Sequence, residues 1–202
     1  MYSTKSAVKS ANLSKYMAAG INENITITEV KVDKSPNGND FIEITFADSD
    51  GRTVTMTEWK NKINSWIKDE TELQKRDDQQ FGRILQVLEC FYTEDKLQVE
   101  LDSFLSMINW VKTMLTVVIP DKKPLRIKVV YDNKGFTTTS HNGIFIEPMD
   151  IEKSNVEKLP RDRFERPVIA DAEVTTSDPL AVVNTTSTPE VNPENKTDNL
   201  PF

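Results

Sequence analysis

The feature that most constrains the fold is a change in the spacing of apolar residues along the chain. Between residues 21 and 59 they recur at every second position, and between 81 and 118 they recur three or four positions apart. A period of two is typical of a strand with one buried face, and a period near 3.6 is typical of an amphipathic helix. Alternation then returns at Leu125. The sequence therefore predicts three strands, a helical segment and further strands.

The first strand begins at Ile21 and contains a shift in phase. Ile25 and Ile27 alternate with threonines, whereas after Glu29 the apolar positions move by one residue. One extra residue in a strand is what a β-bulge accommodates, and a bulge bends the strand so that a sheet can curl. Turn sequences at 35–38 and 48–51 then separate a second strand, 41–46, from a third, 53–59.

The remainder of the predicted domain follows the same reasoning. We expect two helices of about four turns that are joined near 93–95, and Pro120 and Pro124 end the second of them. A fourth strand at 125–131 leads through a hairpin turn at 132–135 to a closing strand at 136–139 and a further piece at 144–146. This is the strand order of the OB-fold, a five-stranded β-barrel. The predicted fold class is mainly β, with a helical insertion at about 60–119 within a domain spanning 21–150.

Charge separates this domain from both ends of the chain. The net charge is -7 over 202 residues, and residues 167–202 hold six acids and one lysine, a net charge of -5. The first twenty residues contain Lys5, Lys9 and Lys15 and no acid. Residues 167–202 also lack any aromatic residue before Phe202, which predicts a disordered acidic tail. We therefore expect a flexible basic N-terminal arm at 1–20 and a linker at 151–166 before the tail.

The chain lacks the residues that several functional classes of protein require. Cys90, the one cysteine, lies beside apolar residues and is predicted to be a buried thiol that forms no intramolecular disulfide. His141 is the one histidine, and the chain has neither a glycine-rich phosphate loop nor a catalytic or metal-binding cluster. Apolar runs are also shorter than the roughly 18 residues a membrane span requires. We expect no enzymatic activity, no cofactor and no metal.

The C-terminus suggests a docking peptide. In Asp198-Asn-Leu-Pro-Phe202, the Phe202 ring can fill an apolar pocket on a partner while the carboxylate pairs with a cation. This ending resembles that of the single-stranded DNA-binding proteins of bacteria and their phages, whose acidic tails end in an apolar residue, proline and phenylalanine. Asp198, Leu200, Pro201 and Phe202 match that pattern, and Asn199 replaces an acid. The segment 42–46 followed by 48–51 is also similar to phage members.

The resemblance implies a function. It indicates a sequence-tolerant protein that protects single-stranded DNA during replication, recombination or repair in the cytoplasm of a bacterial host cell. The tail tip would recruit a polymerase, helicase or recombinase.

The residues themselves indicate where a strand would bind. Non-specific capture of single strands requires aromatic rings that stack on bases and cations that follow phosphates. Trp59 and Phe41 lie on the strand faces opposite Val54 and Ile42, so both are candidates for stacking. The candidate cations are Lys31, Lys60, Lys62, Arg126 and Lys128, which we expect on the same outward surface. Trp66, Trp110 and Phe145 are assigned to the core.

An alternative interpretation retains the same fold. The barrel would be a protein- or RNA-binding adaptor without a role in protecting single strands, with Trp59 packed under the helical insertion and the lysines exposed only to solvent. A comparison of oligo(dT), duplex DNA and RNA as ligands separates the two interpretations.

Overall fold

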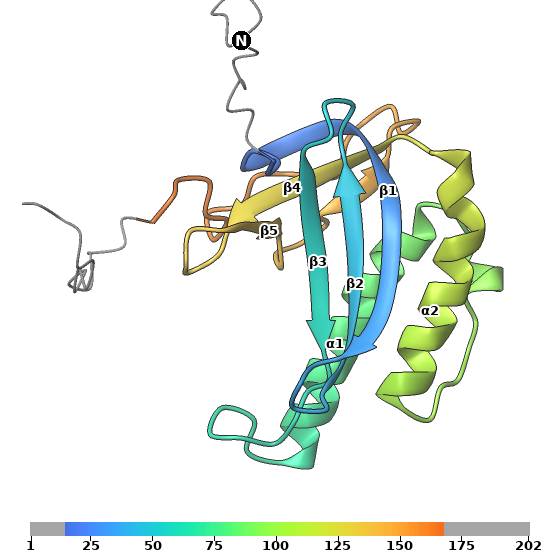
Figure 1. The fold of residues 1–202 in the computed structure, drawn as a ribbon, viewed down its shortest axis with the longest axis vertical. Helices are drawn as coiled ribbons and strands as arrows, with labels where there is room; N and C mark the ends of the chain where they lie inside the picture. Colours follow the sequence, from blue (N-terminus) through green and yellow to red (C-terminus); the bar gives the residue numbers. More distant parts are fainter. Residues whose placement is uncertain (1–14, 168–202) are drawn as a thin grey trace, which may run out of the picture. The chain divides into compact units, whose positions relative to one another are not determined.

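The structure, a computed structural model, describes residues 15–167 and has a mainly β fold with two helices between its third and fourth strands (Figure 1). This arrangement confirms the predicted fold class at the level of strands and helical insertion. The strands are β1 Gly20–Lys34, β2 Asp40–Ala47, β3 Thr53–Trp59, β4 Leu125–Tyr131, β5 Thr137–Thr139 and β6 Ile146–Pro148. The helices are α1 Glu70–Glu89 and α2 Phe104–Val118, with 3-10 turns η1 Glu94–Lys96 and η2 Ile119–Asp121.

The strands form one antiparallel sheet in the order β3-β2-β1-β4-β5, with β6 pairing to β4. β1 is long and pairs with β4 through its first part and with β2 through its second part. Its register shifts between Ile27 and Glu29, which confirms the predicted bulge. β5 contacts β3, but in the described part of the chain no ladder of hydrogen bonds joins them. The sheet is therefore curled and open.

The core lies between the inner face of the sheet and the two helices. In Figure 1, α1 passes behind β1–β3 and α2 lies beside β1. Each helix begins with a capped first turn, in which the side chains of Asp69 and Ser103 accept hydrogen bonds from the backbone N–H groups of Glu72 and Ser106. The buried apolar residues of these elements include Ile42, Ile44, Phe46, Val54, Met56, Ile84, Val87, Leu88, Ile108, Val111 and Leu115. Neither described helix is both long and apolar enough to cross a membrane.

The structure confirms that Phe145 and Cys90 belong to the core, and it moves the start of the folded domain. Phe145 is fully buried, and burial raises the pKa of the Cys90 thiol to about 12, as expected of an unreactive cysteine. Met17, which falls inside the predicted arm, is also buried. Its N–H donates to the carbonyl of Thr53 at 2.9 Å. The folded domain therefore includes residues before Ile21.

The prediction that Lys128 faces outward is wrong. Its Nζ lies 2.8 Å from Asp162 Oδ2, donates to the carbonyl oxygens of Asn142 and Glu157, and is fully buried. The reason is that residues 151–166, expected to be a linker, fold over the second face of β4. Tyr131 N–H also donates to the Arg163 carbonyl at 2.8 Å. Alternation along β4 correctly indicated two faces, but both are covered.

This buried ion pair predicts sensitivity to acid. Burial would raise the pKa of Asp162, but hydrogen bonds from Lys128, Ser140, Asn142 and the Leu159 N–H outweigh it and lower that pKa from 3.8 to about 2. A depressed pKa in the folded state stabilises the fold above the unfolded-state pKa, and this stability is lost as the pH falls toward 2. The loss is about 2 kcal/mol.

Urea denaturation of the parent and of Asp162→Asn across this range measures the effect. The variant should be less stable at neutral pH, and the gap in unfolding free energy should narrow by about 2 kcal/mol between pH 5 and pH 2. A gap that stays constant would show that Asp162 is not held ionised by the fold.

Candidate nucleic-acid interface

The outward face of β1–β3 combines an aromatic pair with threonines and alternating charges. Its rows follow directly from the strand register, because side chains directly opposite one another lie on the same face. The first row is Asp33, Phe41 and Trp59, the second Lys31, Glu43 and Thr57, and the third Glu29, Thr45 and Thr55. We call this set of nine residues the outer face.

Trp59 is the accessible ring of the aromatic pair. The ring centroids of Phe41 and Trp59 are 4.6 Å apart with the planes tilted by 35°. Trp59 is 45% exposed, whereas Phe41 is 8% exposed, with Lys31 Nζ 5.6 Å from the centre of its ring. A base that approaches the outer face therefore meets Trp59 first, and Phe41 supports the Trp59 ring from the next strand.

A basic loop, residues 60–68, continues directly from Trp59. It contains Lys60, Lys62 and Lys68 and no acid. Trp66 is 85% exposed there and Ile63 is 54% exposed. The assignment of Trp66 to the core is wrong, because α1 begins only at Glu70 and the apparent helical spacing before it belongs to a loop. Trp110, by contrast, is partly buried and packs edge-to-face on Phe81, as expected.

The turn that carries Trp66 has a defined shape. Asn64 Oδ1 accepts hydrogen bonds from the N–H groups of Trp66 and Ile67, at 2.8 and 3.1 Å, and the Asn64 N–H donates to the Ile67 carbonyl. The Ile67 side chain is buried and anchors the loop. Asn64-Ser65 is a turn-forming pair among three lysines, and this sequence signal, which the prediction did not use, could have indicated a surface loop.

Helix α1 holds both the end of β3 and the start of the basic loop. Gln80 Nε2 donates to the Trp59 carbonyl and to Glu58 Oε2, each at 2.9 Å. Asn61 Nδ2 donates to Asp77 Oδ1 at 2.9 Å. Glu58 itself is buried against Arg83, and burial raises the pKa of the Glu58 carboxyl despite that neighbour. The backbone around Trp59 is therefore fixed by a buried polar network.

The predicted cations fall into two groups. Lys31, Lys60 and Lys62 lie near the aromatic pair; Lys31 pairs with Asp33 at 3.0 Å and Lys62 donates to the Asn39 side chain. Arg126 lies on β4, where it pairs with Glu23 and Glu147, and Lys128 is buried in the fold. The structure thus brings three of the five predicted cations to the aromatic pair, and Lys68 lies at the other end of the basic loop, just before α1.

A second aromatic group lies at the opposite end of β3. Tyr16 and Phe136 are 64% and 59% exposed and line a cleft of about 320 Å³ together with Arg52 and Arg166. Arg166 lies against the hairpin turn at Gly135, where an added Cβ would come within 3.2 Å of its Nε. We call this the hairpin cleft. It combines exposed rings with guanidinium groups about 20 Å along β3 from Trp59.

Comparison of the sequence with known proteins gives no match, so the site is interpreted from its own residues. No protein-family model matches the chain, and no curated protein matches it in sequence. The predicted partner-binding residues, Asp198, Leu200, Pro201 and Phe202, lie outside the described residues.

Because Phe41 is buried and Trp59 is half-exposed, we expect their replacement by alanine to lower the free energy of unfolding by different amounts. Phe41→Ala removes a buried ring and should lower the free energy of unfolding by about 3 kcal/mol or more. Trp59→Ala removes a half-exposed ring and should cost about 1 kcal/mol, the usual value of an aromatic pair. Guanidinium denaturation of both variants measures the difference. Equal losses would mean that Trp59 is as much a part of the core as Phe41.

Proposed function

We propose that this protein binds single-stranded DNA without strong sequence preference and protects it. The observation that carries the proposal is that residues 59–68 hold two exposed tryptophans, Trp59 and Trp66, and three lysines, Lys60, Lys62 and Lys68, and no acid. Aromatic rings stack on any base and cations follow any phosphate, so this combination suits a single strand of any sequence.

We further infer that the curled sheet is a partly open OB-fold barrel. In support, β1 pairs with both β2 and β4, and β5 contacts β3 across the open edge. In OB-folds the oligonucleotide lies on the face of the second and third strands, which is the outer face that carries Trp59. The fold and the aromatic pair therefore favour the same surface.

The charges on the outer face favour contact with bases over contact with phosphates. Glu29 and Glu43 lie among the threonines of this face, where they would repel a phosphate. The lysines of the basic loop and the guanidinium groups of the hairpin cleft lie at its two ends. We propose that bases stack along the face and that cations hold the phosphates at either end. Duplex DNA, whose bases present no free faces, should bind weakly.

The acidic tail completes the proposal. We propose that its tip, Asp198 and Leu200–Phe202, docks on replication or recombination proteins by inserting Phe202 in an apolar pocket beside a cation. The net charge of -5 on residues 167–202 would also compete with DNA for the basic loop, since a tethered anion acts as an intramolecular ligand.

Stacking is tested by titrating oligo(dT) into single variants. Trp59→Ala and Trp66→Ala should each weaken binding by about 1–3 kcal/mol, the usual value of one stacked base. Trp110→Phe is the matched control, because that ring packs on Phe81 away from the outer face, and it should bind like the parent. Parent fluorescence should be quenched by oligo(dT) and only slightly by duplex DNA.

Two outcomes would contradict the proposal. Unchanged affinity in both variants would remove the stacking sites, and tighter binding of RNA or of a protein than of oligo(dT) would favour the adaptor function.

Tail competition is tested by removing residues 168–202. Truncation should strengthen oligo(dT) binding, most at low salt where charges are least screened, and should abolish capture of replication proteins. Deletion of Phe202 alone is the matched control: it should abolish capture but leave DNA affinity unchanged, because the acids remain. Weaker DNA binding after truncation would show that the tail belongs to the DNA site.

A further inference from the structure

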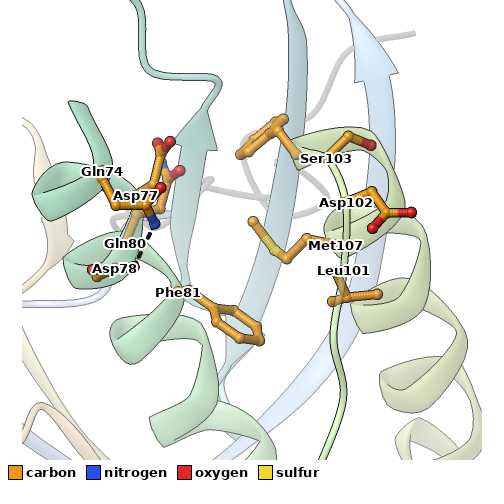
Figure 2. Close-up of a pocket in the computed structure, with 10 residues that line it drawn as sticks. Gln74, Asp77, Asp78, Gln80, Phe81, Leu101, Asp102, Ser103 and Met107 are labelled. Atoms are coloured by element: carbon orange, nitrogen blue, oxygen red, sulfur yellow. Dashed lines mark hydrogen bonds between the residues drawn. The ribbon is translucent and has the colours of Figure 1, made fainter. Parts of the chain in front are cut away.

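A groove lies between α1 and α2, and its walls include Asp77 and Gln80, which hold Asn61 and the Trp59 carbonyl. It has a volume of about 310 Å³, and its floor is formed by Phe81, Leu101, Phe104 and Met107. Figure 2 shows the side chains of Phe81 and Met107 pointing toward one another from the two helices. We call this the interhelical groove.

The rim of the interhelical groove carries only negative charge. Asp77, Asp78 and Asp102 line it, and none of the described residues that line it is a lysine or an arginine. Asn61 donates a hydrogen bond to Asp77, and Gln74 donates one to Asp78 (Figure 2). Both carboxylates therefore have fixed positions. An occupant must therefore supply apolar side chains for the floor and cations for the rim.

The charges of the chain's own ends select one candidate occupant. Residues 167–202 have a net charge of -5 and would be repelled by the rim. Residues 1–14 hold Lys5 and Lys9, no acid, and the apolar residues Tyr2, Val8 and Leu13. Their composition complements the interhelical groove in both charge and hydrophobicity.

The described chain starts at the end of β3 that lies opposite the groove. Tyr16 forms a parallel bridge with Thr53 at the start of β3, so the chain traced back from Tyr16 to Lys15 runs away from Trp59. The groove lies at the other end of β3, because Gln80 on its wall bonds the Trp59 carbonyl. The first described residues and α1's first turn accordingly lie at opposite ends of β3 in Figure 1.

We propose that the interhelical groove binds residues 1–14 of a second copy of this chain. Lys5 and Lys9 pair with the acidic rim, and the apolar residues Tyr2, Val8 and Leu13 around them cover the floor. The donated segment and the groove are different surfaces, so one copy can donate to the next, and the proposed contact is head-to-tail and repeats from copy to copy. The resulting row presents the outer faces in series.

The row has a consequence that rests on the proposed function. If the outer face binds single-stranded DNA, neighbouring copies on one long strand reinforce one another, and binding is cooperative on long but not on short oligonucleotides. Self-association itself requires no DNA, so the two proposals are separable.

Sedimentation velocity of the full chain without DNA, over increasing concentration, tests the contact. The parent should associate reversibly. Lys5→Glu/Lys9→Glu and Asp78→Lys/Asp102→Lys should each associate about tenfold more weakly or worse, because like charges then face one another. An equimolar mixture of the two variants should associate again, because each reversed segment meets a groove of opposite sign. Asp95→Lys/Glu152→Lys, which reverses two exposed acids outside the groove, is the matched control and should behave like the parent.

Several results would overturn this assignment. The parent could stay monomeric at high micromolar concentration, or the Asp78→Lys/Asp102→Lys variant could associate like the parent. The equimolar mixture of the two variants could also fail to regain association. Association lost on removal of residues 168–202 would identify the tail as the occupant instead. Association that follows the charges while oligo(dT) does not bind would retain the groove and refute the proposed function alone.

Discussion

The buried contact between Glu58 on β3 and Arg83 on α1 helps to connect β3 and β5, two sheet edges that no ladder of backbone hydrogen bonds joins in the described residues. Arg83 also donates to Thr139 on β5 at 3.1 Å, so one guanidinium links the two edges of an open sheet through the helix behind them. A buried ion pair gains little over apolar packing, but the loss of either partner is costly because the other charge is left unpaired. The pair therefore makes the approach of the two sheet edges, β3 and β5, depend on the position of α1.

The proposed binding surface depends on the same network. Gln80 connects Glu58 to the Trp59 carbonyl, and Asp77 holds Asn61 in the basic loop. Burial, followed by repulsion from Arg83, lowers the pKa of His141 to about 4, so this imidazole adds no charge to the network at neutral pH. Helix α1 thus has three roles: it joins the sheet edges, it holds the backbone at Trp59 and the side chain of Asn61, and it forms one wall of the interhelical groove.

Local patterns in the sequence predicted what local physics determines. The period of two, the phase shift near Glu29 and the turn sequences predicted the strands and the bulge of β1. Burial that depends on contacts with distant segments could not be predicted from local patterns. Lys128 is buried because residues 151–166 return over β4, and neither that return nor the Asp162 partner has a local signal. Trp66, by contrast, had a local signal that was overlooked. The apolar spacing suggested a helix, whereas the Asn64 turn and the neighbouring lysines place Trp66 in a loop. Phe41 and Trp59 were assigned to the correct face, but only their contact shows which of the two rings is accessible.

The central claim, that single-stranded DNA lies on the outer face and the basic loop, is tested most directly by photocross-linking. Irradiation of the full chain with oligo(dT), followed by mass spectrometry of the attached peptides, identifies the residues that touch bases. The account predicts attachment at Trp59 and Trp66, with competition by unlabelled single strands and little by duplex. Attachment confined to α1 and α2, or equal competition by duplex DNA, would contradict it.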